Sequence, residues 1–306
     1  MKFLATAASF CRTTEEPKQL IAARGYDLVW IPDATKAQII AENPDVIING
    51  IEVIDREIMD SCSNLKVVSH HGVGLDGIDL EYAKEKGIVV RTGKGSNTEA
   101  VADFAFCLMM ACARRLNESQ EITLSGVWKK KVGYGVYGKT LGIIGLGAIG
   151  KGVAKRARGF DMQVLANDIY WDSEFAESWK VKRATIDEII ETCDFITLHC
   201  NLTEESRGMI GYEELKRMKK TAILVNTGRG PLVDHDGLVK GLEEELIAGA
   251  GIDVYDVEPA PADDPLFAIP NVIHTPHAAA YTVESLANMS IFAVRNAFEE
   301  LDKMGL

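Results

Sequence analysis

Three residues carry the functional groups most suited to chemistry on a small organic acid. Arg229 in VNTGRG, Glu258 in DVYDVEP and His277 in TPHAAA each follow an apolar run typical of a buried strand. An arginine guanidinium can hold a carboxylate through two hydrogen bonds and polarise a neighbouring carbonyl. A histidine exchanges a proton near neutral pH, and an adjacent carboxylate raises its pKa. Together the three side chains could bind a carboxylate and move a proton beside it.

Each of these residues also has a purely structural interpretation. Arg229 could form a salt bridge at the end of a strand, and Glu258 could be an exposed acid in a loop. His277 could be a histidine with satisfied hydrogen bonds after a proline turn. We expect His235 to lie on the surface and His274 to lie within a strand. Which interpretation is correct therefore depends on the strands and turns that position these residues.

The stretch at residues 138–170 predicts a partner for this chemistry. An apolar run is followed by Gly145, Gly147 and Gly150 in G-x-G-x-x-G spacing, by a helical pattern and by a second apolar run. The first glycine permits a tight turn, the second lets a pyrophosphate approach the backbone, and the third lets the helix pack on the strand. The helix N-terminus offers free N–H groups to the phosphates. A helix packed closely on a strand without a ligand is the alternative.

Asp168 ends the second apolar run, 18 residues after Gly150. A carboxylate at this distance can accept hydrogen bonds from the ribose hydroxyls of a dinucleotide. Its charge would repel a 2′-phosphate, and Ile169 and Tyr170 supply no cation to offset that charge. The sequence therefore favours NAD over NADP.

A second glycine loop, HGVGLDGID at residues 71–79, follows a strand that ends at Ser69. Ligands of open α/β sheets bind beyond the carboxyl ends of strands, and successive backbone N–H groups can hold a small anion. A turn that uses glycine for a positive φ, with Asp79 capping the next helix, explains the loop equally well.

The composition excludes several other classes of protein. The 306 residues are 47% hydrophobic and 25% charged, as in a soluble globular protein long enough for two domains. A net charge of −12 argues against a nucleic-acid partner, and no apolar run is long enough to span a membrane. The N-terminus is more typical of a strand than of a signal peptide, so we expect a cytoplasmic protein. The six cysteines form no CxxC pair and predict no metal site.

Strands alternate with helices along the chain, which predicts an α/β fold with parallel sheets. Residues 98–116 form one long pattern that is apolar almost all round and predicts a buried helix. The last helix, at residues 283–303, is amphipathic and is expected to return to the first domain. The expected strands are 3–6, 27–30, 46–49, 66–69, 88–90, 141–144, 164–166, 194–198, 222–225, 249–254 and 272–274.

Several segments in this order resemble the D-isomer-specific 2-hydroxyacid dehydrogenases, a family that includes glycerate, lactate and phosphoglycerate dehydrogenases. They are GVGLDGIDL, SNTEAVADFAF, GKTLGIIGLGAIG, LHCNLT, VNTGRGPLVD, GAGIDVYDVEP and TPHAAAYT. The resemblance implies two Rossmann-like domains, with an NAD-binding domain at 99–282 inserted in a discontinuous substrate domain at 1–98 plus 283–306. It also implies a homodimer formed through the cofactor domain.

The resemblance assigns roles to individual residues. His277 would be the acid/base, Glu258 its partner and Arg229 the clamp on the substrate carboxylate, which the amides of Val73 and Gly74 would also hold. Asp253 would meet the nicotinamide amide. The implied NAD contacts are Gly145, Gly147, Ala148, Ile149, Gly150, Asp168, Cys200, Thr227, Asp253, His277 and Ala279.

The resemblance also restricts the substrate. Phosphoglycerate enzymes of the family carry an arginine at the position of His70 and another near Asn49 and Gly50, so both phosphate-binding charges are missing here. The sequence predicts an NAD-dependent enzyme that interconverts a small D-2-hydroxy acid and its 2-oxo acid. The alternatives are a D-3-phosphoglycerate dehydrogenase, a glyoxylate or hydroxypyruvate reductase, and an NAD-sensing binding protein of the same fold.

Overall fold

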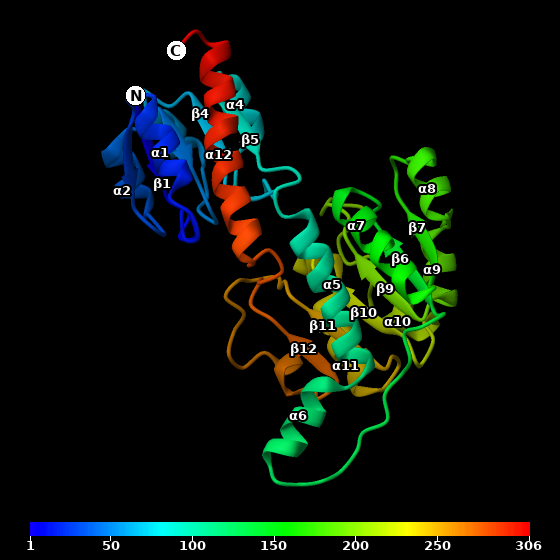
Figure 1. The fold of residues 1–306 in the computed structure, drawn as a ribbon. Coiled ribbons are helices and arrows are strands. Elements are labelled where there is room, and N and C mark those ends of the chain that lie inside the picture. The colour runs from blue at the N-terminus through cyan, green and yellow to red at the C-terminus, as the bar shows by residue number, and fades with distance from the viewer. The chain divides into compact units, whose positions relative to one another are not determined.

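The computed structural model describes all residues from Met1 to Leu306 and contains two compact units (Figure 1). The first unit combines Met1–Asn97 with Ala280–Leu306, and the second is Thr98–Ala279. The second unit lies close to the domain expected at residues 99–282. Each unit contains one parallel sheet, so the predicted α/β fold with two parallel sheets is confirmed.

The first unit has a five-stranded parallel sheet in the order β2-β1-β3-β4-β5. Its strands are β1 (Lys2–Ala5), β2 (Asp27–Trp30), β3 (Val46–Ile48), β4 (Val67–His70) and β5 (Val89–Thr92). Its helices are α1 (Glu16–Ala23), α2 (Lys36–Glu42), α3 (Arg56–Ser61), α4 (Leu80–Glu85) and α12 (Val283–Lys303). One core lies between the sheet and α1 with α12, and the other lies between the sheet and α2, α3 and α4.

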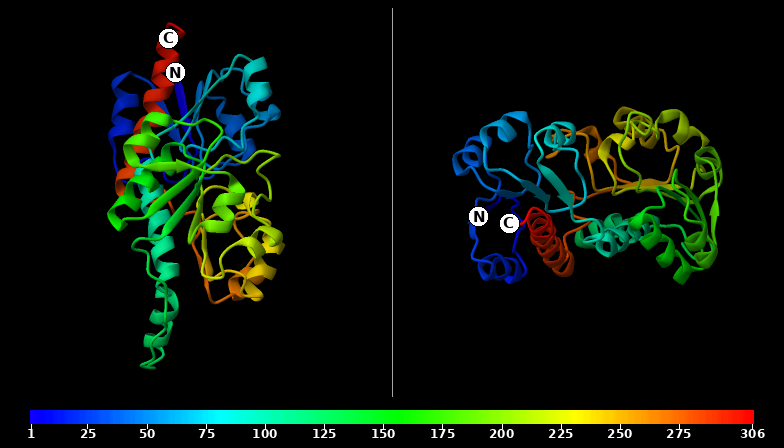
Figure 2. Two further views of the ribbon diagram at one scale, coloured as in Figure 1. Left: turned by 90° about the vertical axis from the view of Figure 1, so that its right-hand side faces the viewer. Right: turned by 90° about the horizontal axis from the view of Figure 1, so that it is seen from above.

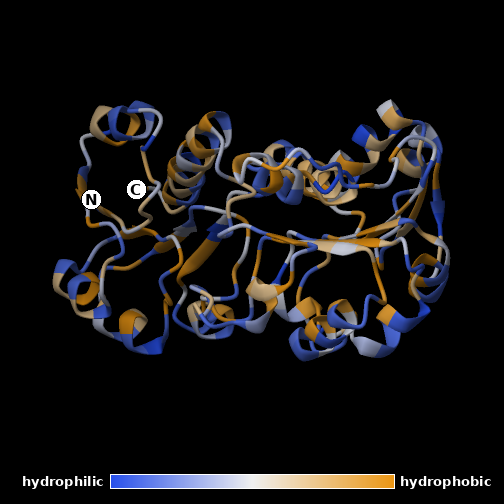
Figure 3. Cartoon of the chain, turned by 90° about the horizontal axis from the view of Figure 1, so that it is seen from below, coloured by the Kyte–Doolittle hydropathy of each residue, from blue (hydrophilic) through white to orange (hydrophobic).

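Helix α12 brings the end of the chain back to this sheet, as its amphipathic pattern predicted. Ala293 and Ala297 are fully buried against the strands, and Phe298 makes an edge-on ring contact with Phe3 at 5.8 Å between centroids. Small residues on the inner face of the helix let it approach the sheet closely. Figure 3 shows the apolar faces of the helices turned toward the sheets and the polar faces turned outward.

The second unit has a seven-stranded parallel sheet in the order β12-β11-β10-β9-β6-β7-β8. Its strands are β6 (Thr140–Ile144), β7 (Gln163–Asn167), β8 (Val181–Arg183), β9 (Phe195–Leu198), β10 (Ile223–Asn226), β11 (Gly249–Ile252) and β12 (Val272–His274). Its helices are α5 (Thr98–Ala113), α6 (Leu116–Leu124), α7 (Ala148–Ala157), α8 (Ser173–Trp179), α9 (Ile186–Thr192), α10 (Tyr212–Arg217) and α11 (His235–Glu243), with short 3-10 helices at Arg158–Phe160, Gly230–Leu232 and Pro265–Ala268.

Helices cover both faces of this sheet, as the end-on view in Figure 2 shows. One core includes side chains of α5, α7 and α8, and the other includes side chains of α9, α10 and α11. The strand order reverses between β6 and β9. Ligands of open α/β sheets bind at such a reversal, beyond the carboxyl ends of the strands.

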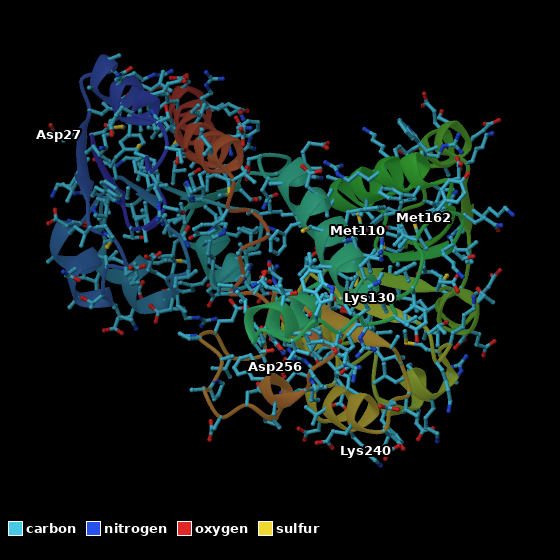
Figure 4. All side chains as sticks on the ribbon, turned by 60° about the horizontal axis from the view of Figure 1, so that its bottom comes forward. Asp27, Met110, Lys130, Met162, Lys240 and Asp256 are labelled. Atoms are coloured by element: carbon cyan, nitrogen blue, oxygen red, sulfur yellow. The ribbon has the colours of Figure 1, made fainter.

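The prediction of one buried helix over residues 98–116 is wrong at its end. Helix α5 stops at Ala113, Arg115 takes a left-handed backbone conformation (φ 50°), and α6 starts at Leu116. Helix α5 also exposes Cys107 and Met110, because it packs on strands and on α7 through only part of its surface. Met110 is labelled in Figure 4. The Ala113 carbonyl accepts the Tyr134 N–H at 2.7 Å, so a residue from the loop after α6 occupies the last carbonyl of the helix.

The sequence patterns did not predict helices α6 and α8 or strand β8, which extends the sheet beyond β7. Helix α6 and the following loop project from the rest of their unit (Figures 1 and 2). None of the helices combines the length and the apolar character needed to cross a bilayer.

Candidate active site

The three glycines after β6 have three different physical roles. Gly145 has φ +100°, and a Cβ there would collide with the backbone of His199 and Cys200. A Cβ at Gly150 would collide with the carbonyl oxygen of Gly145, so this glycine permits close packing of α7 on the loop. Gly147 differs because nothing lies within 4 Å of the Cβ position. The open side of Gly147 leaves room for a ligand to approach the backbone.

Helix α7 begins directly after this open glycine. Gly147 is the N-cap and has no side chain to accept hydrogen bonds from the first turn. Gly147 and Ala148 are exposed and Ile149 is half-buried, so the N-terminal amides are accessible. These amides and the positive end of the helix dipole fit the pyrophosphate of a dinucleotide.

Asp168 lies beside the same loop, just beyond β7. One of its carboxylate oxygens accepts the Leu146 N–H at 2.6 Å, and the other accepts the Tyr170 N–H at 2.7 Å. Each oxygen keeps a further lone pair for a ribose hydroxyl. Ile169 and Tyr170 are exposed and uncharged, as the preference for NAD requires.

Arg229, Glu258 and His277 follow β10, β11 and β12, three neighbouring strands of the sheet. The His277 Nδ1 lies 2.7 Å from Glu258 Oε2, so the two side chains are within hydrogen-bond distance. The other Glu258 oxygen accepts the Tyr255 N–H at 3.0 Å, so the carboxylate is oriented by its own loop. The Arg229 side chain donates to the Gly228 carbonyl at 2.8 Å.

This arrangement shifts the pKa values of the pair in opposite directions. The hydrogen bond to Glu258 raises the pKa of His277, against the effects of burial and of the Arg229 charge. Burial alone would raise the pKa of Glu258, but the bond to His277, the Tyr255 amide and the Arg229 charge hold it below its usual range. The geometry therefore favours an imidazolium paired with a carboxylate through the ring nitrogen Nδ1.

Asp253 holds the turn that carries His277. This carboxylate is fully buried and accepts hydrogen bonds from the Thr275 hydroxyl at 2.5 Å and from the Ala278 and Ala279 amides at 2.8 and 3.0 Å. His277 itself has a left-handed backbone (φ 52°), which non-glycine residues rarely adopt. Asp253 therefore binds the chain on both sides of the strained residue. Sequence reasoning assigned Asp253 and Ala279 to NAD and did not find this internal network.

A further histidine lies at the reversal of strand order and was not singled out by sequence reasoning. His199 follows β9, with Nε2 2.9 Å from the Thr197 hydroxyl and Nδ1 3.5 Å from the Thr227 hydroxyl. Desolvation lowers the pKa of His199 to about 3, so the ring is neutral. It is placed to orient Thr227, an expected NAD contact. The adjacent Cys200, also an expected NAD contact, has its pKa raised to about 11 by burial.

The Val73 and Gly74 amides belong to the other unit. Neither N–H donates a hydrogen bond within that unit, so both are available to an anion. Asp79 caps α4 by accepting the Tyr82 N–H at 3.0 Å, which agrees with the structural interpretation of this end of the loop. His70 lies at the end of β4, 3.4 Å from the Asn49 side-chain oxygen.

A cavity of about 900 Å³ in the second unit has the wrong charge for this chemistry. It is lined by the six acids Glu213, Glu214, Asp234, Asp236, Asp256 and Asp264, with Arg207 and His235 as the basic residues. Burial and the nearby acids raise the pKa of Asp256 (labelled in Figure 4). His235 is half-buried and bonded to Asp264 at 2.9 Å rather than free on the surface. The carboxylates disfavour an organic acid or the phosphates of NAD.

The residues of the second unit thus fit a bound NAD: an open glycine, an uncapped helix N-terminus and an acid at the end of β7. No group of three or more His, Cys, Asp or Glu side chains is arranged to hold a metal ion. The six cysteines are unpaired.

Comparisons with known proteins agree with this arrangement. The family model for the NAD binding domain of D-isomer specific 2-hydroxyacid dehydrogenases matches residues 106–279. A glyoxylate reductase from Korarchaeum cryptofilum is 45% identical over 249 residues, which cover 79% of this chain and 75% of that protein.

Two solved structures share the fold over nearly the whole chain. A glyoxylate reductase from Paecilomyes thermophila is 28% identical, with a TM-score of 0.88 and coverage of 99% of this chain and 96% of that one. A D-lactate dehydrogenase with NAD⁺ from Lactobacillus jensenii is also 28% identical, with a TM-score of 0.77 and coverage of 97% and 96%. The chain therefore belongs to the D-isomer-specific 2-hydroxyacid dehydrogenases, NAD-binding oxidoreductases, as the sequence predicted.

Proposed function

We propose that this enzyme reduces glyoxylate or a similarly small 2-oxo acid with NADH, and that Arg229, Glu258 and His277 carry the reaction. The observation that carries the proposal is the His277–Glu258 pair at 2.7 Å, in the same unit as the open glycine loop. The glyoxylate reductase names of relatives at 40–45% identity support a small oxo acid.

In the direction of reduction, the bound nicotinamide supplies the hydride. Arg229 holds the substrate carboxylate and draws electron density from the 2-oxo carbonyl. His277, protonated because Glu258 raises its pKa, donates its Nε2 proton to the oxygen that becomes the hydroxyl. Glu258 stays ionised and keeps the imidazole ring in one orientation through Nδ1. In the direction of oxidation, neutral His277 takes the hydroxyl proton.

The amides of Val73 and Gly74 are proposed to hold the substrate carboxylate as well. The positions that carry phosphate-binding arginines in phosphoglycerate enzymes hold His70, Asn49 and Gly50. A substrate with a phosphate group would lack its counter-charges here, which makes a phosphoglycerate dehydrogenase the weaker alternative. An NAD-sensing protein without turnover would not need an oriented acid/base pair.

We also propose a homodimer formed through the second unit. The projecting arm, defined as α6 with residues 125–137, exposes large apolar side chains that a monomer rarely leaves in water. The most exposed are Trp128 at 90%, Val132 at 89%, Leu124 at 79% and Tyr137 at 72%. The same arm carries the lysines Lys129, Lys130 (labelled in Figure 4) and Lys131, which suit an acidic partner such as a second copy of this chain.

Steady-state rates over a panel of 2-oxo acids test the proposed reaction. We expect glyoxylate and hydroxypyruvate to be reduced with NADH in preference to NADPH, because Asp168 would repel a 2′-phosphate. Oxidation of 3-phosphoglycerate should be slower than oxidation of unphosphorylated hydroxy acids. Binding of NADH without turnover of any 2-oxo acid would favour the NAD-sensing alternative.

A further inference from the structure

We infer that Thr92 is a positioning residue that turns the Val73 and Gly74 amides toward the substrate carboxylate. Thr92 is the last residue of β5, next to the His71–Gly77 loop. Its hydroxyl lies 3.2 Å from the Gly72 carbonyl oxygen and 3.1 Å from the Val73 carbonyl oxygen. The single hydroxyl proton of Thr92 is therefore shared between two consecutive carbonyls of the loop.

The orientation of the amides follows from the geometry of the peptide bond. In a planar trans peptide, the carbonyl of one residue and the N–H of the next point in opposite directions. Because the Gly72 carbonyl is held toward β5, the Val73 N–H points away from β5. Because the Val73 carbonyl is also held there, the Gly74 N–H points away as well. The two amides assigned to the carboxylate are thus the two that Thr92 orients.

Other contacts keep Thr92 and the start of the loop in place. The Gly93 N–H donates to the Gly72 carbonyl at 2.7 Å, and the Asn296 side chain donates to the Thr92 carbonyl at 3.0 Å. Before the loop, the buried His71 ring lies 2.8 Å from the Ser290 hydroxyl, and the His71 backbone N–H donates to the Asn49 carbonyl at 2.8 Å. The loop is therefore held on both sides, while the amides of Val73 and Gly74 remain unpaired within the unit.

A hydroxyl that only stabilises the fold would have a different effect from one that orients two ligand-binding amides. The inference rests on the proposed function, because it assumes that those amides bind the substrate carboxylate. It predicts that loss of the Thr92 hydroxyl weakens binding of the oxo acid without weakening binding of NADH. NADH contacts belong to the other unit and should not respond.

The test compares Thr92→Val, which removes the donor and keeps the shape, with Thr92→Ser, which keeps the hydroxyl. We expect Thr92→Val to raise the KM for glyoxylate about fivefold or more, consistent with the loss of one hydrogen bond, and to leave the KM for NADH unchanged. The inhibition constant of oxamate, an unreactive analogue, should rise in parallel. Thr92→Ser should restore values near wild type. If Thr92→Val does not fold, Thr92→Ala carries the same comparison.

The matched control is Thr192→Val in α9, where the Thr192 hydroxyl also donates to a backbone carbonyl, that of Glu188 at 2.6 Å. This variant should keep wild-type kinetics. An unchanged KM for glyoxylate in Thr92→Val, or an equal rise in the KM for NADH, would overturn the inference while leaving the proposed function intact. Failure of the wild type to reduce any 2-oxo acid would instead overturn the proposed function.

Discussion

Each unit has a glycine loop after a buried strand, but the two loops lead into their helices in different ways. In the second unit, α7 starts directly after Gly147, an N-cap without a side chain. In the first unit, Asp79 caps the short helix α4 with its own carboxylate. The open N-cap of α7 leaves its helix amides free for the phosphates of a ligand. At α4, the Asp79 carboxylate accepts a hydrogen bond from one of the helix amides. The identity of the N-cap residue thus separates the dinucleotide loop from a loop that offers only turn amides.

The two units also use histidine in opposite ways. His277 is half-exposed beside Glu258, and this carboxylate raises its pKa. His71 is buried between the hydroxyls of Ser9 and Ser290, and burial lowers its pKa to about 4. A neighbouring carboxylate and access to solvent make a proton donor, whereas burial among neutral hydroxyls makes a structural ring.

The largest expected effect is on turnover. His277→Ala should lower kcat for reduction of the oxo acid by about 10²–10⁴-fold, because it removes the proposed proton donor. His71→Gln should keep most of its kcat, since that ring holds no proton used in the reaction. NADH affinity should stay near wild type in both variants. A His277→Ala enzyme that keeps a tenth of its kcat would show that another group supplies the proton.

The second effect is on the pH dependence of the free energy of unfolding. The pKa of folded His71 lies below its usual 6.5, so the unfolded chain binds more protons as pH falls from 6.5 toward 4. The neutral buried ring therefore costs up to about 3 kcal/mol of stability over this range. His277, with a raised pKa, has the opposite sign: its contribution is complete below its unfolded pKa and is lost as pH rises through the folded pKa.

The measurement is the urea midpoint between pH 7 and pH 4.5 for wild type, His71→Gln and His277→Ala. Loss of stability with falling pH should be shallower in His71→Gln than in wild type. It should be somewhat steeper in His277→Ala. The same slope in His71→Gln and wild type would mean that His71 is not held neutral.

The third effect tests the role of the N-cap. Gly147→Asp would give α7 the same kind of cap as α4, and nothing lies within 4 Å of its Cβ to block the substitution. The new carboxylate should repel the pyrophosphate and weaken NADH binding by about a hundredfold. Gly159→Asp is the matched control, because that glycine is exposed and its Cβ position is also open. Fluorescence titration with NADH gives the affinities of both variants. If the two variants bind NADH equally well, the α7 N-terminus does not contact the cofactor.

The smallest effect is a shift in pH dependence. Glu258→Gln removes the charge that raises the pKa of His277, so this pKa should fall. Reduction needs protonated His277, so the high-pH decline of kcat/KM should move to lower pH. Oxidation needs the neutral ring, so its rising limb should move to lower pH too. Profiles in both directions that stay in place, or move to higher pH, would contradict the pairing.

Short-range patterns in the sequence were enough to predict most of the strands and helices of the second unit. The spacing of Gly145, Gly147 and Gly150 predicted the strand, turn and helix. Gly145 and Gly150 leave no room for a Cβ atom, and Gly147 leaves its side of the loop open to a ligand. Strand β12 and helix α12 have the bounds that the apolar patterns predicted. The end of α5 at Ala113 was not predicted, since an apolar run does not show which of its faces finds a partner.

The sequence by itself determined the family, the parallel α/β fold, the dinucleotide loop and the three residues at the strand ends. These follow from residue types at short spacing and from the rule that parallel strands end at one edge of their sheet. Only the tertiary structure decided which side chains meet. It joined His277 to Glu258 across 19 residues, placed Asp253 under the His277 turn, and set the Thr92 hydroxyl against two loop carbonyls. Such contacts depend on distances between segments that are far apart in the chain, and the strand register that sets those distances depends on packing across the whole sheet.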